Sequence, residues 1–182
     1  MRPDRNQPGG SGRVVERPGT IRPDLAGLNW QVIDDGVMGG RSRGRVEAGP
    51  EGVRFSGELS TANNGGFSSV RGRLARPRSG LLEVRLRVRG DGRVYQFRLR
   101  ESGDSEAPAW RAEFATTGEW RQLRLPAADF EAVIRGRRLE ILPALRERTI
   151  RYVGLMLNAR DTGPFELDVD RLELVYDGAP DD

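Results

Sequence analysis

The sequence predicts an all-β protein, an antiparallel β-sandwich of about ten short strands with one short helix. Apolar and polar residues alternate over much of the chain, which is typical of strands with one buried face. Gly, Pro, Asn and Asp separate these runs at short intervals, as turns separate neighbouring antiparallel strands. The 182 residues are enough for one domain that buries its own core.

In the first half of the chain, we expect short strands before residue 80 and two longer ones after it. The short strands are NWQVI (29–33), GRVEA (44–48), GVRFSGEL (52–59) and FSSVRGRL (67–74). In LLEVRLRVR (81–89), apolar residues alternate with charged ones. The next run, RVYQFRLRE, repeats this pattern with an inner face made of Tyr95, Phe97 and Leu99. The GDG sequence between the two runs is a tight-turn signal, so we expect them to form a hairpin.

Two further strands and the helix follow. The strand AWRAEFA has an inner face made of Trp110, Ala112 and Phe114. After an ATTG turn, the strand EWRQLRLP ends at Pro126, which cannot donate a hydrogen bond to a ladder. The segment AADFEAVIRG (127–136) is the one place where a short helix is expected.

The end of the chain is predicted to hold a loop and two strands. The loop RRLEILPALRERT (137–149) contains one helical turn and is interrupted by a proline. TIRYVGLMLN and PFELDVDRLELVY are the closing strands. In the second of these the apolar phase slips after Val169, which indicates a β-bulge near Asp170.

The sandwich domain is expected to span residues 25–177, between tails at residues 1–24 and 178–182. The N-terminal tail is rich in Pro, Gly and Arg, as disordered segments are, and lacks the apolar run of a signal peptide. No stretch of about 18 apolar residues occurs, so we expect no membrane insertion. A cytoplasmic location is the expectation that follows.

The composition excludes several kinds of chemistry. Cys, His and Lys are absent, and all 30 basic residues are arginines. Ser–His and Cys–His pairs, a lysine Schiff base and a P-loop lysine are therefore excluded, and zinc would lack its usual ligands. We expect a non-enzymatic binding protein without a metal or cofactor. The remote alternative is glycoside hydrolysis by two carboxylates, although no spacing pairs the available candidates. These candidates are Asp34, Asp35, Glu58 and Asp161.

The charge pattern does not predict a nucleic-acid partner. The net charge is only +3, because 27 carboxylates nearly balance the arginines. If the hairpin forms, the arginines at 85, 87 and 89 face Arg98 and Arg100 in a basic stripe, which we interpret as a solvated face. No recognition helix, zinc finger or RNP-type aromatic strand is evident, so no specific nucleic acid is expected.

Two glycine motifs carry the functional question. DDGVMGGRS (34–42) and NNGGFSSVR (63–71) each join small polar residues to a diglycine and an arginine. Neither matches the dinucleotide fingerprint or the EF-hand spacing. In one interpretation they are turns whose backbone conformation requires glycine, and an ion pair between Asp35 and Arg71 holds them together. In the other they form the rim of a site whose polar groups bind a sugar or a peptide backbone.

These motifs also carry a resemblance. NWQVIDDGVMGGRSRG, followed by GVRFSGELSTANNGGFSSVRG, resembles the signature of the complex I intermediate-associated protein 30 family. EWRQLRLPAADFEAVIRGR and TIRYVGLMLNARDTGPFELDVDRLEL are similar to later segments of that family, so the resemblance covers about residues 28–176. It implies a galactose-binding-domain-like jelly-roll sandwich, the architecture of many non-catalytic carbohydrate-binding modules. Mitochondrial members assist the assembly of respiratory complex I by associating with its intermediates. A chain without their long targeting extension looks like a bacterial-type member.

The resemblance also implies where binding residues lie, and it brings no catalytic residue. The positions that match the family pattern are Trp30, Asp35, Gly36, Val37, Met38, Gly39, Gly40, Ser42, Phe55, Gly57, Leu59, Ser60, Asn64, Gly65, Gly66, Phe67 and Arg71. The candidate binding residues are Trp30, Asp34, Asp35, Met38, Arg41, Ser42, Asn63, Asn64, Phe67 and Arg71. The expected role is an assembly protein whose partners are respiratory-complex intermediates. The alternative is a carbohydrate-binding module whose partner is a glycan.

Overall fold

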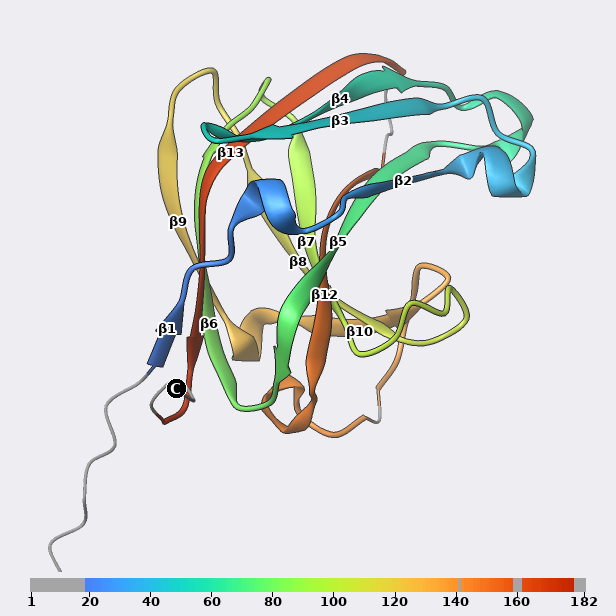
Figure 1. Cartoon of the computed structure of the whole chain (residues 1–182). Coiled ribbons are helices and arrows are strands. Elements are labelled where there is room, and N and C mark those ends of the chain that lie inside the picture. Colours follow the sequence, from blue (N-terminus) through green and yellow to red (C-terminus); the bar gives the residue numbers. More distant parts are fainter. Residues whose placement is uncertain (1–18, 141, 159–161, 179–182) are drawn as a thin grey trace, which may run out of the picture.

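Two antiparallel sheets pack face to face in this structure, a computed structural model that describes residues 19–140, 142–158 and 162–178 (Figure 1). One sheet has six strands and the other has seven. Because all pairings between the described strands are antiparallel, the predicted all-β sandwich is confirmed.

The six-stranded sheet follows the order β3, β4, β13, β6, β9, and β1 pairs with the end of β13. Its strands are β1 (Gly19–Ile21), β3 (Arg43–Gly49), β4 (Gly52–Leu59), β6 (Leu81–Arg89), β9 (Arg121–Pro126) and β13 (Gly163–Tyr176). The seven-stranded sheet follows the order β11, β10, β8, β7, β12, β5, β2. Its strands are β2 (Gln31–Asp34), β5 (Phe67–Arg78), β7 (Val94–Arg100), β8 (Ala109–Ala115), β10 (Glu131–Ile134), β11 (Arg137–Arg138) and β12 (Ile150–Asn158).

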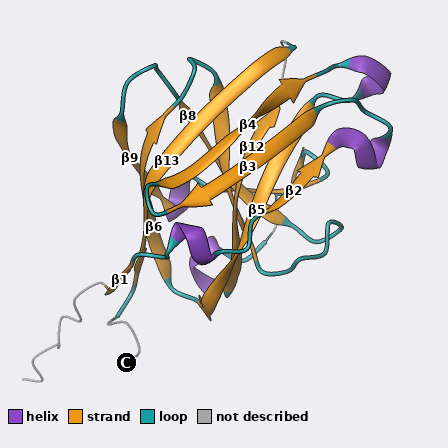
Figure 2. Ribbon diagram, turned by 45° about the horizontal axis from the view of Figure 1, so that its top comes forward, coloured by secondary structure: helices purple, strands orange, loops and turns teal. Residues whose placement is uncertain are grey.

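Short 3₁₀ turns connect some of the strands (Figure 2). They are η1 (Leu25–Gly27), η2 (Asp35–Met38), η3 (Ala62–Asn64), η4 (Ala127–Asp129) and η5 (Leu145–Glu147). In the described ranges no helix has the length and apolar character that crossing a bilayer requires.

The core lies between the sheets and consists of the side chains that the alternation assigned to the inner faces. On β7 the expected residues Tyr95, Phe97 and Leu99 are at most 2% exposed. From the other sheet, the rings of Phe55 and Phe165 meet edge to face with their centroids 4.9 Å apart. Burying one such ring stabilises the fold by about 1.5–3 kcal/mol, so this contact is a major part of the inner layer.

The predicted hairpin between residues 81–89 and 93–101 is wrong. β6 pairs with β13 and β9 in one sheet, whereas β7 pairs with β12 and β8 in the other. The connecting Asp91 accepts hydrogen bonds from the Tyr95 hydroxyl (3.0 Å) and from the Glu166 amide (2.9 Å), which anchors the turn to β13. The Asp-Gly signal marks a turn correctly, but it does not say whether the next strand stays in the same sheet.

The expected helix over residues 127–136 is reduced to one 3₁₀ turn, η4, followed by strand β10. Arg135 and Gly136 have φ values of 48° and 76°, and they form the two-residue turn of a hairpin with β11. Positive φ at both positions gives a turn whose twist matches that of paired strands. The run of apolar residues before this turn therefore belongs to a strand that is buried on both faces, with Ala132 at 9% and Val133 at 1% exposure.

Other predictions about the C-terminal half are confirmed. The pairing of β13 with β6 shifts register between Val169 and Arg171, which is the bulge expected near Asp170. The single turn η5 lies in the expected loop.

At the N-terminus β1 pairs with β13, so the sheet includes residues before the expected domain start at residue 25. The rest of the expected tails, residues 1–18 and 179–182, lies outside the described residues.

Candidate functional site

The two glycine motifs lie side by side at one end of the sandwich, where η2 and η3 are neighbours (Figures 1 and 2). The first motif leads from β2 in the seven-stranded sheet to β3 in the six-stranded sheet. The second leads from β4 back to β5. Both motifs are therefore crossovers between the two sheets, and they meet because β2 pairs with β5 and β3 pairs with β4.

Asp35 holds the two motifs together. Its side chain is fully buried, and its Oδ1 accepts a hydrogen bond from the Ser42 amide (2.9 Å). Its Oδ2 accepts hydrogen bonds from the Ser42 hydroxyl (2.6 Å), the Gly66 amide (2.7 Å) and the Phe67 amide (3.4 Å). Because these donors come from both motifs, the carboxylate is a structural link between them.

The protonation state of Asp35 follows from the same contacts. Burial by itself raises the pKa of this carboxyl group, but the hydrogen bonds from Ser42, Gly66 and Phe67 outweigh burial and lower the pKa below its ordinary value. Asp35 is thus an ionised acceptor at neutral pH. Since protein donors already occupy its oxygens, it is poorly placed to bind a ligand or to transfer a proton.

One glycine of each diglycine, Gly40 and Gly65, is required by the close approach of backbone to this carboxylate. A Cβ atom on Gly40 would lie 2.3 Å from Cγ of Asp35. A Cβ atom on Gly65 would lie 2.5 Å from Oδ2 of Asp35 and 2.9 Å from Cα of Gly40. A side chain at Gly40 would displace the Asp35 carboxylate, and a side chain at Gly65 would also separate the two loops.

Asp34 makes a second link between the sheets. Its Oδ2 accepts a hydrogen bond from the Gly44 amide of β3 (2.8 Å), and its Oδ1 accepts one from the Ser68 hydroxyl of β5. The Ser42 hydroxyl in turn accepts a hydrogen bond from the Ser60 amide (3.0 Å). The polar groups of the two motifs therefore satisfy one another, which favours the interpretation of the motifs as turns whose backbone conformation requires glycine.

The remaining candidates have separate positions. Asn63 adopts φ of 56°, and its side-chain amide donates to the Gly39 carbonyl (3.1 Å). Arg41 is exposed, and Phe67 is half-buried at the start of β5. Trp30 packs against the core and donates from its Nε1 to the Leu25 carbonyl (2.8 Å). The side chains of Met38 and Asn64 lie outside the described part.

Arg71 does not form the expected ion pair with Asp35. It lies four residues beyond Phe67 on β5, a separation of about 13 Å along a strand. Its Nη1 donates to the Gly103 carbonyl (2.8 Å), and its guanidinium lies 5.9 Å from the ring centre of Tyr152. The two motifs are pinned as that interpretation required, but the donors are Ser42 and backbone amides.

Around Arg71 the strand pairing assembles residues that were not among the candidates. Four arginines, which we call the arginine cluster, lie on the outer face of the seven-stranded sheet and are half-buried. They are Arg71, Arg98, Arg100 and Arg111. The expected basic stripe is also corrected, because the arginines of β6 lie on the other sheet, away from Arg98 and Arg100. Alternation alone gave the outward direction of these side chains, but the cluster depends on which strands are neighbours.

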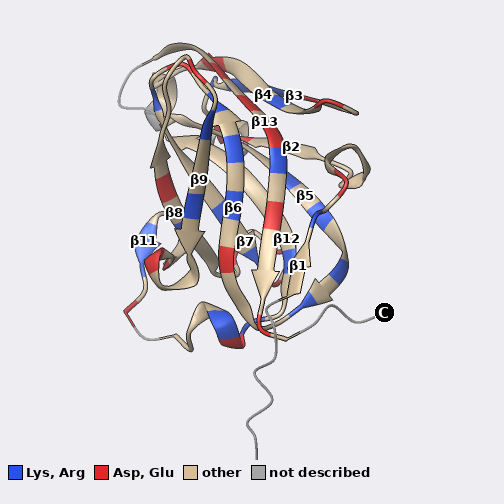
Figure 3. Ribbon diagram, turned by 90° about the vertical axis from the view of Figure 1, so that its left-hand side faces the viewer, with Lys and Arg blue, Asp and Glu red and all other residues tan. Residues whose placement is uncertain are grey.

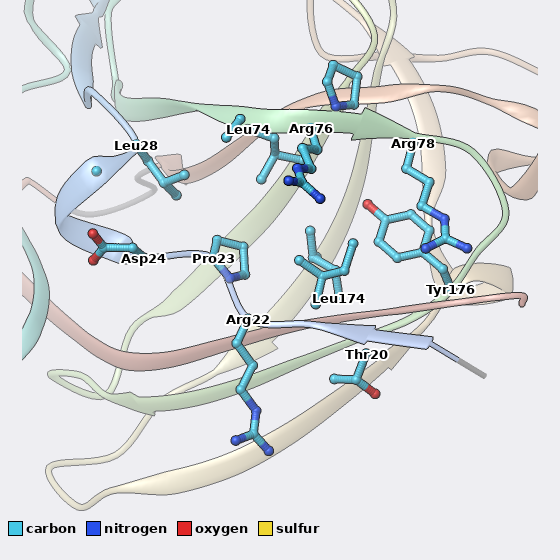
Figure 4. A pocket seen from close by; sticks show the side chains of 14 residues that line it. Thr20, Arg22, Pro23, Asp24, Leu28, Leu74, Arg76, Arg78, Leu174 and Tyr176 are labelled. Carbon is cyan, nitrogen blue, oxygen red and sulfur yellow. The ribbon is translucent and has the colours of Figure 1, made fainter. Parts of the chain in front are cut away.

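A pocket of about 610 Å³ lies apart from the glycine motifs, between the β1–η1 segment and the second half of β5 (Figure 4). Its apolar walls include Leu28, Leu74, Leu174 and Tyr176, and the guanidinium of Arg78 lies 5.1 Å from the ring centre of Tyr176. None of the candidate residues lines it. The pocket marks where the N-terminal segment crosses the edge of the sandwich.

The family is decided by a match that includes both glycine motifs. Residues 22–169 match the model of the family described as complex I intermediate-associated protein 30. The chain belongs to this family. The resemblance found in the sequence motifs is thereby confirmed over most of the chain.

Several solved structures with the same architecture are carbohydrate-binding modules. A family 11 module from Clostridium thermocellum, in complex with a β-1,3-1,4-mixed-linked tetrasaccharide, is 16% identical, with 89% of this chain and 98% of that chain covered and a TM-score of 0.61. The xylan-binding module CBM15 is 12% identical, with 90% and 100% covered and a TM-score of 0.57. A mutant family 29 module is 6% identical, with 90% and 88% covered and a TM-score of 0.56. At these identities the likeness is one of fold, and it confirms the expected galactose-binding-domain-like jelly roll.

Proposed function

We propose that this chain is a non-catalytic binding domain that associates with protein intermediates during the assembly of respiratory complex I. The observation that carries the proposal is the family match over residues 22–169. The role comes from the family description, and the structure contributes a two-sheet scaffold on which a partner can be held.

The geometry of the glycine motifs supports binding over catalysis. Asp34 and Asp35 are adjacent, but each carboxylate is bonded to its own set of protein donors. A glycosidase needs one carboxyl group that gives a proton and a second that attacks or activates water. Neither aspartate has the free oxygen that such a role requires. Of the candidate residues, exposed Arg41 and half-buried Phe67 are the ones we propose as partner contacts at this end of the sandwich.

Co-purification from the native host tests the proposal. The tagged chain, crosslinked in cells, is expected to recover complex I subunits. The Arg41→Ala/Phe67→Ala variant is expected to recover fewer, and Arg124→Ala, an exposed position on the other sheet, is the matched control. Failure of the wild-type chain to recover any complex I subunit, together with normal complex I levels in a deletion strain, would contradict the proposal. A cytoplasmic location belongs to the same proposal, and cell fractionation tests it.

Glycan binding is the second candidate, favoured by the likeness in fold to carbohydrate-binding modules. Phe67 lies on the outer face of the seven-stranded sheet beside Ser69, and its half-buried ring is the one we propose to stack on a sugar. Affinity electrophoresis in mixed-linked β-glucan and in xylan would show retardation of the wild-type chain. Retardation lost in Phe67→Ala and kept in Val94→Ala, another exposed apolar position, would support this candidate.

A further inference from the structure

The arginine cluster is a compact set of charges on one face. Strand pairing places Arg71 opposite Gly154, Gly154 opposite Arg98, and Arg98 opposite Arg111. Neighbouring strands are about 4.8 Å apart, so the row from Arg71 to Arg111 is about 14 Å long. Arg100 lies two residues beyond Arg98 and points to the same face.

The cluster has little compensation from carboxylates. Among the described residues no acidic oxygen lies within 4.0 Å of Arg71, Arg98 or Arg100. Arg71 and Arg100 donate instead to backbone carbonyls of the loop between β7 and β8. A peptide carbonyl accepts a hydrogen bond but carries no net charge to balance a guanidinium.

The acidic groups near the cluster are few and partly used. Glu131 lies 3.8 Å from Arg111 and is shared with a second arginine of β11. Asp104 lies near Arg100 and favours its charged form. Glu113 is exposed on the next row of the same face. The centre of the cluster therefore retains excess positive charge.

Arg98 at the centre is held in place with one nitrogen of its guanidinium, Nη2, unused. Its Nη1 donates to Oε1 of Gln96 (3.0 Å) and contacts Sδ of Met156 (2.7 Å). Its Nε is buried and has no acceptor among the described residues, and no bond from Nη2 to the protein is found there. Because Nε is shielded from solvent, Nη2 is the nitrogen that can donate to a carboxylate of a partner.

The electrostatics agree with this geometry. Burial, together with the nearby charges of Arg100, Arg111 and Arg71, lowers the pKa of Arg98 to about 10. Burial and Arg71 likewise lower the pKa of Arg100 to about 10. Both groups remain protonated at neutral pH, so the cluster holds charges that repel one another and that an anion would stabilise.

We propose that the arginine cluster binds an acidic segment of the protein partner, with a carboxylate on Nη2 of Arg98 and further carboxylates on the flanking arginines. This inference rests on the proposed function, because it names the chemistry by which an assembly intermediate is recognised. Arginine is suited to the task since its planar fork matches the geometry of a carboxylate.

The surroundings favour a peptide over an acidic glycan. Sugar recognition usually uses a free aromatic ring, and the ring on this face nearest the cluster, Tyr152, is covered by the guanidinium of Arg71. Phe67 is about 13 Å from Arg71 along β5, so one sugar cannot use both. Carboxylates of Asp and Glu need no such platform.

The test uses fluorescence anisotropy of two labelled peptides of equal length, oligoglutamate and oligoglutamine. Unlabelled oligogalacturonate and inorganic phosphate are added as competitors of the oligoglutamate peptide. We expect the full chain to bind oligoglutamate with an affinity that falls as salt is raised, and not to bind oligoglutamine. Arg71→Gln/Arg98→Gln should bind the oligoglutamate peptide at least about tenfold more weakly than the wild type. The matched control, Arg124→Gln/Arg171→Gln, removes two exposed arginines from the other sheet and should bind like the wild type.

Other outcomes would overturn the proposal. Equal loss in the two double variants would mean that net charge alone binds the peptide. Tighter binding of oligogalacturonate than of oligoglutamate would point to an acidic glycan, and equally tight binding of phosphate would reduce the cluster to a simple anion site. Arg98→Lys keeps the charge but removes the fork, so it is expected to weaken binding several-fold while leaving the melting temperature unchanged. Unweakened binding by this variant would contradict the role of the Arg98 guanidinium.

The proposal and the proposed function fail in different ways. If complex I subunits co-purify equally with the wild type and with Arg71→Gln/Arg98→Gln, the assembly role stands and the cluster is not its binding site. If the cluster binds oligoglutamate but the wild type recovers no complex I subunit, the chemistry of the face stands and the assembly role is wrong.

Discussion

The outer faces of the two sheets both carry arginines, but they differ in how the charges are compensated. On the six-stranded sheet, blue and red residues lie next to one another along and between the strands (Figure 3). Asp168 is bonded to Arg54 (2.7 Å) and to Arg89 (3.1 Å), and Asp170 is bonded to Arg87. On the seven-stranded sheet, three of the four cluster arginines have no carboxylate of a described residue within 4.0 Å.

The difference originates in one strand of each sheet. In both sheets an interior strand runs beside the arginine-bearing strand: β13 beside β6, and β12 beside β7. The acidic residues that β13 places against those arginines are Asp168, Asp170 and Glu173. The outward residues that β12 places beside the cluster are Tyr152, Gly154 and Met156. A chain with a net charge of only +3 can therefore present one neutralised face and one that is strongly basic.

The largest effect is expected from breaking the compensated face. Asp168→Ala removes the carboxylate shared by Arg54 and Arg89 and should lower the free energy of unfolding by about 2–3 kcal/mol, because the aspartate is mostly buried while its partners are partly exposed. Urea denaturation measures this change. The exposed acid Glu113, on the other face, is the control, and Glu113→Ala should have little effect. Equal losses in the two variants would mean that the faces are not electrostatically different.

Acid unfolding should separate the faces next. The hydrogen bonds and charges of Arg54 and Arg89 outweigh burial and lower the pKa of Asp168, and the pKa of Asp35 is lowered as well. Stability from these groups is fully present above their unfolded pKa of about 3.8 and is lost as pH falls through the lower folded values. Melting temperatures measured from pH 6 to about pH 2 should therefore fall less steeply in Asp168→Asn than in the wild type. A variant of the other face, Arg98→Met, should keep the wild-type slope.

The strands and the core are the part of the fold that the sequence predicts well. Alternation places Tyr95, Phe97 and Leu99 inside, and the phase slip locates the bulge after Val169, since both depend only on which face of a strand a residue occupies. Which strands pair with each other depends on residues far apart in the chain, and the two-residue alternation of apolar and polar side chains does not specify it. For this reason the turn at residues 90–92 is recognised, whereas its passage to the other sheet is not.

The same limit applies to the candidate site. The glycine motifs are recognisable because close backbone approach demands glycine at positions such as 40 and 65. Asp35, which accepts hydrogen bonds at the centre of the two motifs, is also predicted from the sequence. Arg71 is wrongly assigned as its partner: Arg71 is near Gly66 and Phe67 in the sequence, but β5 carries it away from Asp35. The arginine cluster joins residues from β5, β7 and β8, so no short stretch of sequence reveals it.

Supplying the missing carboxylate should make the two faces alike. Gln96 is buried, and its Oε1 already accepts a hydrogen bond from Arg98, so Gln96→Glu converts that contact into an ion pair without changing its shape. We expect the free energy of unfolding to rise by about 1 kcal/mol. The variant should also bind oligoglutamate about tenfold more weakly, because the internal carboxylate competes for Arg98. A stability gain without loss of peptide binding would show that the peptide uses other residues.

The smallest effect, and the most direct comparison, comes from the same substitution on each face. Arg89→Met removes the ion pair with Asp168 and a guanidinium 4.9 Å from the ring centre of Trp120, so it should lower the free energy of unfolding by about 1 kcal/mol. Arg98→Met removes a repelled charge but leaves the buried Gln96 without its donor, and these effects oppose each other. We therefore expect a change within about 0.5 kcal/mol for Arg98→Met, measured by the same urea titration. If Arg98→Met leaves stability unchanged but weakens binding of the acidic peptide, Arg98 is held in place for a partner. If Arg98→Met loses as much stability as Arg89→Met, Arg98 is instead part of the scaffold.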